Sequence, residues 1–151
     1  MGMVLFYHLT RSAARETAVV LLGKAIGVGW RVMVRGTDPA KLAALDADLW
    51  LGPDDGFLAH GLAGGAHDAD QPILLGTGAI ANAARCLMLV DGAEVSLPEI
   101  ESLERVWVLF DGQNEAALGH ARGQWKTLTG AGVSAQYWSE ESGKWEKKAE
   151  K

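Results

Sequence analysis

The sequence predicts an α/β sandwich with a mostly parallel central sheet. Two observations support this class: short apolar segments rich in β-branched residues alternate with longer segments of helical periodicity, and the chain has 151 residues, of which 48% are hydrophobic. That length is enough for one domain with its own core. We expect residues 1–138 to form this single domain and residues 139–151, which are mostly charged, to form a tail that frays.

Two strand and helix units fill the first 50 residues. Residues 4–9 are short and β-rich, and Ser12 can cap a helix that reaches about residue 27. Residues 31–35 alternate charged and β-branched side chains and indicate a second strand, and residues 38–50 begin with Asp-Pro and indicate a second helix. The buried stripe of the first helix is expected to contain Ala18, Leu21, Leu22 and Ala25.

Residues 51–71 are rich in Gly, Pro, Asp and His and predict an irregular connection. The next strands are expected at residues 72–75, 85–90 and 105–110, with a helical turn at residues 98–103. The link between the first two is short for a crossover helix, so the sheet can be mixed rather than wholly parallel. A last helix at residues 114–128, ended by Gly130 or Gly132, leads to a strand at residues 133–138.

Charge and cysteine content exclude several classes of function. A formal net charge of -5 and a pI near 5.3 argue against a protein that holds a nucleic-acid backbone by itself. The single cysteine, Cys86, lies in an apolar run and is interpreted as a buried structural thiol, as expected for a protein of the reducing cytoplasm. The amino terminus has neither a basic lead nor a long apolar stretch, so we expect no membrane anchor.

No phosphate-binding loop, cofactor site or metal site is predicted. The segment after the first strand, HLTRSAARE, has no glycine, and GTGAIANA at residues 76–83 has an incomplete glycine pattern. His60, His67, Asp68 and Asp70 border a glycine-rich stretch that we interpret as a surface loop. We predict no catalytic residue, because the sequence has no nucleophile elbow and no paired carboxylates. A nucleotide-binding α/β enzyme remains the alternative hypothesis.

The predicted last helix carries an unusual group of side chains. Arg122 and Lys126 lie four residues apart with Trp125 between them, so two positive charges stand beside one indole on a helix face. In an acidic chain this group predicts a site for an acidic peptide with an apolar tip. Six tryptophans accompany only three phenylalanines. We interpret Trp30 and Trp107 as packing residues and Trp50, Trp125 and Trp138 as candidate partner anchors.

Five motifs occur in a specific order: FYHL, LW with PDDGFLAHGLAG at residues 49–64, QPILL at residues 71–75, RGQWK, and the closing YW with GKWE. Together they resemble the chi subunit family of bacterial DNA polymerase III. The resemblance implies a Rossmann-like α/β/α domain and a non-catalytic accessory subunit of the clamp loader. Such a subunit links the replication machinery to the acidic carboxyl-terminal tail of single-stranded-DNA-binding protein, and contacts DNA only indirectly.

The resemblance also implies roles for particular residues. Arg122 matches the basic residue that takes the terminal carboxylate of the tail, and Lys126 attracts the aspartates upstream. Trp125, Val133 and Tyr137 are expected to wall a pocket for the terminal phenylalanine. Family members often carry another basic residue where this chain has Leu118.

A second surface is expected at Trp50 and Phe57. These two resemble the family positions that hold the psi subunit or a competing helicase-like protein.

Overall fold

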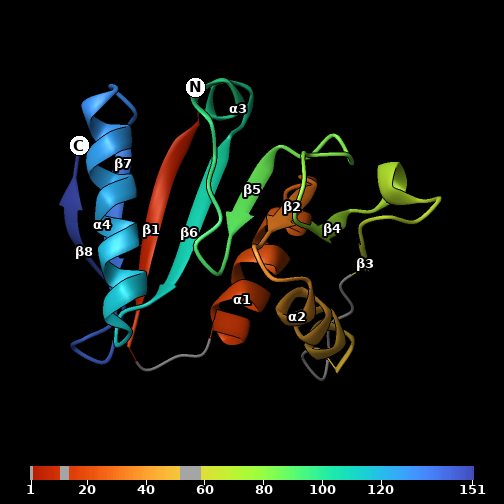
Figure 1. Cartoon of the computed structure of the whole chain (residues 1–151), viewed down its shortest axis with the longest axis horizontal. Helices are drawn as coiled ribbons and strands as arrows, with labels where there is room; N and C mark the ends of the chain where they lie inside the picture. The colour runs from red at the N-terminus through yellow and green to blue at the C-terminus, as the bar shows by residue number, and fades with distance from the viewer. Residues whose placement is uncertain (1, 11–13, 52–58) are drawn as a thin grey trace.

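Strands and helices alternate along the chain. The structure is a computed structural model that describes residues 2–10, 14–51 and 59–151. Within these residues the strands are β1 (Met3–Leu9), β2 (Val32–Arg35), β3 (His60–Leu62), β4 (Ile73–Gly76), β5 (Cys86–Leu89), β6 (Arg105–Asp111), β7 (Ala135–Ser139) and β8 (Glu146–Glu150). They form one sheet of eight strands in the order β3-β4-β2-β5-β6-β1-β7-β8 (Figure 1).

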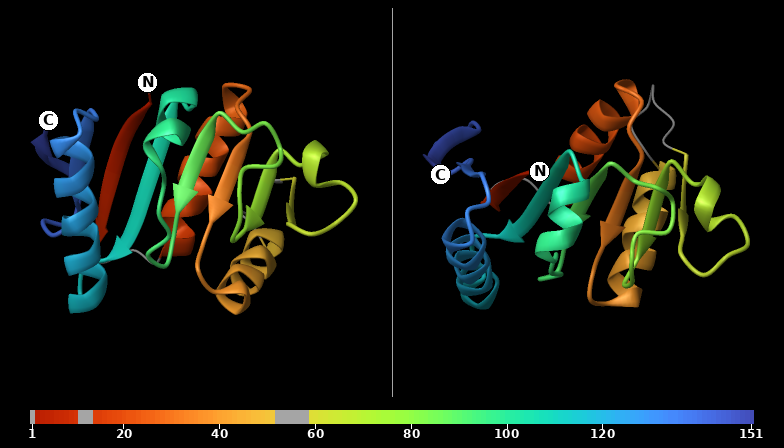
Figure 2. Two further views of the ribbon diagram at one scale, coloured as in Figure 1. Left: turned by 45° about the horizontal axis from the view of Figure 1, so that its top comes forward. Right: turned by 90° about the horizontal axis from the view of Figure 1, so that it is seen from above.

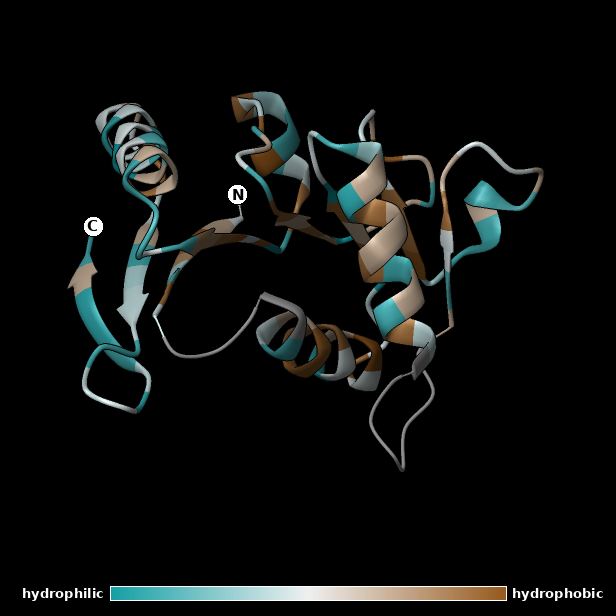
Figure 3. Ribbon diagram, turned by 60° about the horizontal axis from the view of Figure 1, so that its bottom comes forward, coloured by the Kyte–Doolittle hydropathy of each residue, from teal (hydrophilic) through white to brown (hydrophobic). Residues whose placement is uncertain are grey.

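Helices cover both faces of this sheet. They are α1 (Ala14–Gly27), α2 (Pro39–Leu51), α3 (Leu97–Ser102) and α4 (Glu115–Gly130), with a 3₁₀ turn at Asp68–Asp70. Figure 3 shows α3 and α4 above the sheet and α1 below it. The predicted α/β class and three-layer arrangement are therefore confirmed. None of the described helices is long and apolar enough to cross a membrane.

Side chains alternate between two cores, one on each face of the sheet. In β2, Met33 joins the core under α3 and α4, whereas Val32 and Val34 join the core under α1 and α2. The same alternation recurs in β4, β5 and β6, as expected for strands buried on both faces. The predicted buried stripe of α1 is confirmed, with Ala18, Leu21, Leu22 and Ala25 all in the second core.

Cys86 is fully buried, as predicted, and lies in the core under α1 and α2. Burial raises the pKa of its thiol to about 11. The reactive thiolate is therefore scarce at neutral pH, which fits a structural role.

The crossover from β4 to β5 is parallel although it contains no helix. β2 pairs in parallel with both strands, and the antiparallel pairing within the described residues is that of β7 with β8. Residues 77–85 cross over β2 as an irregular segment with several bends, and Ile80 and Ala84 pack against the core. The buried Asn82 amide donates hydrogen bonds to the carbonyls of Gln71 and Val32, at 2.9 and 3.1 Å. A side chain thus satisfies backbone acceptors in a parallel crossover that contains no helix.

Two segments expected to be irregular contain strands. Residues 60–62 form β3 and pair with β4 at one edge of the sheet. At the other edge residues 146–150 form β8, so the expected fraying of residues 139–151 is wrong. Figure 2 shows the sheet twisting between these two edges. The proposed helix cap Ser12 and the candidate Phe57 lie outside the described residues.

Candidate peptide-binding surface

Helix α4 begins with a side-chain cap. The Asn114 side-chain oxygen accepts a hydrogen bond from the backbone N–H of Ala117 at 3.0 Å, which satisfies one donor of the first turn. Ala121 and Leu128 are buried and fix the face that α4 turns to the sheet. The helix contacts β6 and β7. The cap and these two apolar contacts together orient the polar side chains between them.

Trp125 is held between the helix and the sheet. Its ring meets Phe6 of β1 edge to face, with centroids 5.5 Å apart, and meets Tyr137 of β7 in the same way at 5.9 Å. Phe6 and Tyr137 stack nearly parallel at 6.5 Å. The indole is half-buried, so part of it rests on the core and part of it faces solvent. Such edge-to-face contacts hold an aromatic side chain in a fixed orientation.

Arg122 and Lys126 are exposed on α4, on either side of Trp125 along the chain. They are four residues apart and are therefore neighbours on the helix surface. Within the part of the chain that the structure describes, neither has a salt-bridge partner. Two positive charges are thus held side by side next to an aromatic cluster.

Tyr137 connects this helix to the sheet. Its hydroxyl lies 2.8 Å from Nδ1 of the buried His8, and Nε2 of that ring lies 3.7 Å from a carboxylate oxygen of Glu141. Burial raises the pKa of Tyr137, the positive charge of Arg122 lowers it, and the negative charge of Glu141 raises it. Arg122 and Glu141 therefore lie within electrostatic range of the same phenol, with opposite signs.

The structure brings most of the predicted peptide-binding residues together. Arg122, Trp125 and Lys126 share α4, and Tyr137 touches Trp125 from β7. Val133 precedes β7 and is 3% exposed, so its side chain belongs to the core behind this surface. We call Arg122, Trp125, Lys126 and Tyr137 the α4–β7 surface.

Sequence reasoning missed two residues of this region. These are His8 and Glu141, of which His8 joins Tyr137 to Glu141. The alternation along β1 places Phe6 and His8 on the same face, and this signal was available in the sequence. The position of Glu141 was not available, because it depends on the hairpin that follows β7.

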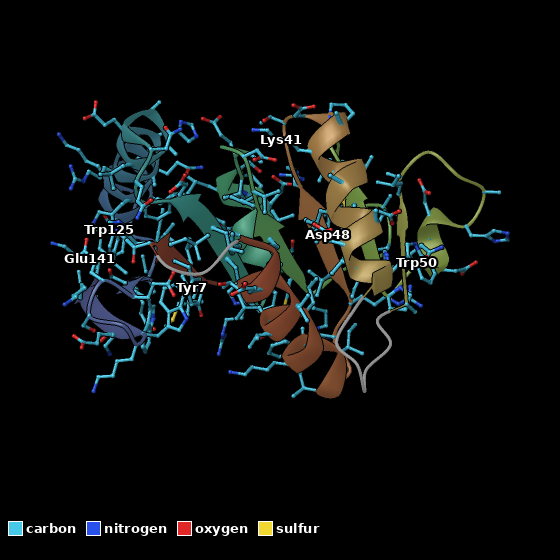
Figure 4. All side chains as sticks on the ribbon, turned by 90° about the horizontal axis from the view of Figure 1, so that it is seen from below. Tyr7, Lys41, Asp48, Trp50, Trp125 and Glu141 are labelled. Atoms are coloured by element: carbon cyan, nitrogen blue, oxygen red, sulfur yellow. The ribbon has the colours of Figure 1, made fainter. Side chains whose placement is uncertain are left out.

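Trp50 lies far from this surface. Figure 4 shows Trp50 and Trp125 at opposite ends of the molecule. Trp50 is 57% exposed, and its ring lies against that of His60 with centroids 4.5 Å apart and the planes tilted by 44°. His60 is itself buried and lies 3.1 Å from the Asp46 carbonyl and 3.3 Å from its carboxylate. This polar and aromatic contact fixes His60 as a structural residue beneath an exposed indole.

The loop residues considered for a metal site have structural contacts instead. The Asp68 carboxylate accepts hydrogen bonds from the backbone N–H groups of Gly64 and Gly65 at 2.9 and 3.0 Å. His67 and Asp70 are both 81% exposed. The residues that the structure describes contain no group of three or more His, Cys, Asp and Glu able to hold a metal ion.

A cleft of about 870 Å³ opens at the carboxyl ends of β1, β5 and β6, where α/β proteins often bind ligands. Its carboxylates have local roles. Asp38 accepts from the backbone N–H of Ala40, and Asp111 accepts from that of Gln113, both at 2.9 Å. Asp91 lies 3.6 Å from Lys41. These carboxylates form a helix cap, a turn and a surface ion pair, and these contacts do not pair a general acid with a general base.

The incomplete glycine pattern at residues 76–83 also has a packing explanation. A Cβ added at Gly76 would lie 2.7 Å from the Cβ of Ala63, so the glycine permits close approach of this backbone to the preceding loop. Nearby, Arg35 donates to both carboxylate oxygens of Glu99, at 3.1 and 2.6 Å. The Arg35 guanidinium therefore donates its hydrogen bonds within the protein and does not point to a phosphate site.

Comparison with known proteins supports a replication role. Residues 1–136 match the family described as DNA polymerase III chi subunit, HolC. The chain belongs to the DNA polymerase III chi subunit family. Its members are accessory subunits of that polymerase, so the resemblance seen in the motifs is confirmed. A search of curated proteins finds no match.

The family match has a boundary that matters for the site. Arg122, Trp125, Lys126 and Val133 fall inside it, whereas Tyr137 and all of β8 lie after its last residue.

Proposed function

We propose that the protein links the clamp loader of DNA polymerase III to the acidic carboxyl-terminal tail of single-stranded-DNA-binding protein, through the α4–β7 surface. The observation that carries this proposal is the pair Arg122 and Lys126. Both are exposed, stand one helical turn apart, and have no salt-bridge partner in the described residues, beside a half-buried indole. Within a chain of net charge -5, this arrangement favours an anionic ligand with an apolar end.

Each side chain has a distinct task in this proposal. The planar guanidinium of Arg122 binds the terminal carboxylate of the tail with two hydrogen bonds. The exposed edges of Trp125 and Tyr137 receive the terminal phenylalanine, and Val133 supports them from the core. Lys126 attracts the aspartates upstream.

The same proposal includes a second surface at Trp50, which would bind the psi subunit or a helicase-like protein. An exposed indole held on a buried histidine is a typical anchor for a protein partner. The candidate Phe57 lies outside the described residues. In this proposal the protein is not an enzyme, needs no cofactor, meets DNA only through its partners, and acts in the bacterial cytoplasm, where replication takes place.

Titration of a tail peptide tests the primary site. The probe is a synthetic acidic peptide ending in Pro-Phe with a free carboxylate, measured by calorimetry against the full chain. Arg122→Ala should weaken binding by at least about 1.5 kcal/mol, because a charge-assisted hydrogen bond is lost.

The matched control is Arg85→Ala, since Arg85 is also exposed but is paired with Glu104 at 3.0 Å. Unchanged affinity in Arg122→Ala, or an equal loss in both variants, would refute the site. A thermal shift with nucleotides would instead support the alternative of a nucleotide-binding enzyme.

A further inference from the structure

Strand β8 lies beyond the family match yet is firmly built into the sheet. It pairs with β7 over residues 136–139, and the backbones of Ala135 and Lys151 extend this pairing with hydrogen bonds of 2.9 and 3.3 Å. In the connecting hairpin, Trp145 packs edge to face on Tyr7 at 5.2 Å. The hairpin is therefore anchored both by backbone pairing and by an aromatic contact on the α1 side of the sheet.

The pairing register between β7 and β8 shows which β8 side chains lie on the same face of the sheet as the α4–β7 surface. Residues directly opposite each other on paired strands point to the same side of a sheet. Ala149 is opposite Tyr137, and Lys151 is opposite Ala135. Tyr137 and Ala135 both pack in the core under α4. Lys151 therefore stands on the α4 side, next to the start of β7.

The pairing of β7 with β8 shifts register between Tyr137 and Trp138, so Lys148 has no residue directly opposite it on β7. Lys147 is opposite Trp138, on the side of the sheet away from α4. Its Nζ lies 3.3 Å from a carboxylate oxygen of Glu150. The Glu150 carboxylate also accepts a hydrogen bond from Gln136 on this side. The Lys148 Nζ instead lies 3.3 Å from Glu146, which is opposite Ser139 on the α4 side. Adjacent lysines thus point to opposite faces of the sheet, and Lys148 joins Lys151 on the α4 side.

Two rows of cations consequently border Tyr137. Arg122 and Lys126 form one row along α4, and Lys148 and Lys151 form the other along β8. Glu141 and Glu146 set two carboxylates against these four cations.

We propose that Lys148 and Lys151 form an additional subsite for the acidic residues upstream of the carboxyl terminus of a bound peptide. Leu118, one turn before Arg122, packs against the core and adds no charge to the first row, so further positive charge comes from β8. This inference rests on the proposed function, because it assigns β8 to the same peptide.

The test compares a double lysine variant on the α4 side of β8 with a single lysine variant on the opposite face. Lys148→Ala combined with Lys151→Ala should weaken binding of a ten-residue acidic peptide roughly threefold to tenfold at low salt, as expected for exposed ion pairs. Lys147→Ala is the matched control. Lys147 and Lys148 have similar side-chain exposure, 42% and 45%, and each has a glutamate partner at the same distance. It should leave affinity within about twofold.

A second peptide separates the possible outcomes. When its upstream aspartates are replaced by asparagine, the double variant and the wild type should bind it equally. If the double variant binds the acidic peptide as tightly as Lys147→Ala does, while Arg122→Ala still weakens it, the β8 subsite is wrong and the α4–β7 surface stands. If Arg122→Ala also has no effect, both proposals fail.

Discussion

The two halves of the sheet use their arginines differently. In the half that contains β2, the Arg35 guanidinium is buried and binds Glu99 and the carbonyls of Gly78 and Glu94. In the half that contains β7, Arg122 is exposed and has no salt-bridge partner among the described residues. A buried cation that the fold neutralises contributes to stability, whereas an exposed cation is available to a ligand. The same residue type should therefore give opposite phenotypes in the two halves.

Removing Arg35 should have a much larger effect on stability than removing Arg122. Arg35→Ala leaves the Glu99 carboxylate with its hydrogen bonds from Ser96 alone and removes the guanidinium donor from two carbonyls, and should lower the free energy of unfolding by about 3 kcal/mol. Binding of the acidic peptide should not change. Denaturant unfolding and calorimetry on the same preparation measure both quantities. Lower stability in Arg122→Ala than in Arg35→Ala would overturn the comparison.

The pH dependence of stability sharpens this prediction. The hydrogen bond from Arg35 is the largest cause that lowers the pKa of Glu99 from 4.5 to about 2. Because the folded pKa is depressed, the stabilisation is complete above pH 4.5 and is lost as the pH falls toward 2. The free energy of unfolding of the wild type should therefore fall in this window more steeply than that of Arg35→Ala. Parallel slopes would mean that the ion pair does not form.

Trp50 should show an intermediate effect on stability and none on the peptide. Because its side chain is mostly exposed, Trp50→Ala should lower the free energy of unfolding by at most about 1 kcal/mol. Trp107→Ala is the buried control and should cost about 3 kcal/mol or more. In a pull-down from native extract, Trp50→Ala should lose a protein that wild type retains. Equal recovery of all proteins would leave Trp50 with only a packing role.

The sequence was sufficient for α4 but not for its surroundings. Helical spacing alone places Arg122 and Lys126 on one face, because that relation depends only on residues four apart. The contact between Trp125 and Phe6 depends instead on how α4 docks on β1, which no local pattern specifies. The family resemblance supplied Val133 and Tyr137 by analogy, but not Phe6.

The ends of the sheet were the least predictable part of the fold. β3 has three residues and depends on its pairing with β4, and β8 has the sequence EKKAE, whose charges suggest a solvated tail. Such strands form because a neighbouring edge offers unpaired N–H and C=O groups. The register shift that lets Lys148 and Lys151, three residues apart, share one face is likewise a property of the pair of strands, not of either sequence.

The smallest predicted effect concerns Glu141, the negative charge beside the α4–β7 surface. It lies 3.7 Å from His8 and acts on Tyr137 against Arg122. It should repel an acidic peptide, so Glu141→Gln should strengthen binding by about 0.5 kcal/mol at low salt, and less as salt screens the charge.

The control for Glu141→Gln is Asp70→Asn, which changes the net charge equally near β3 at the opposite edge of the sheet. Calorimetric titration of the tail peptide at two salt concentrations distinguishes the two variants. An equal gain in both would show that the peptide responds to the overall charge of the protein and not to the local balance between Arg122 and Glu141. A gain confined to Glu141→Gln would show that the carboxylate limits the affinity of this surface.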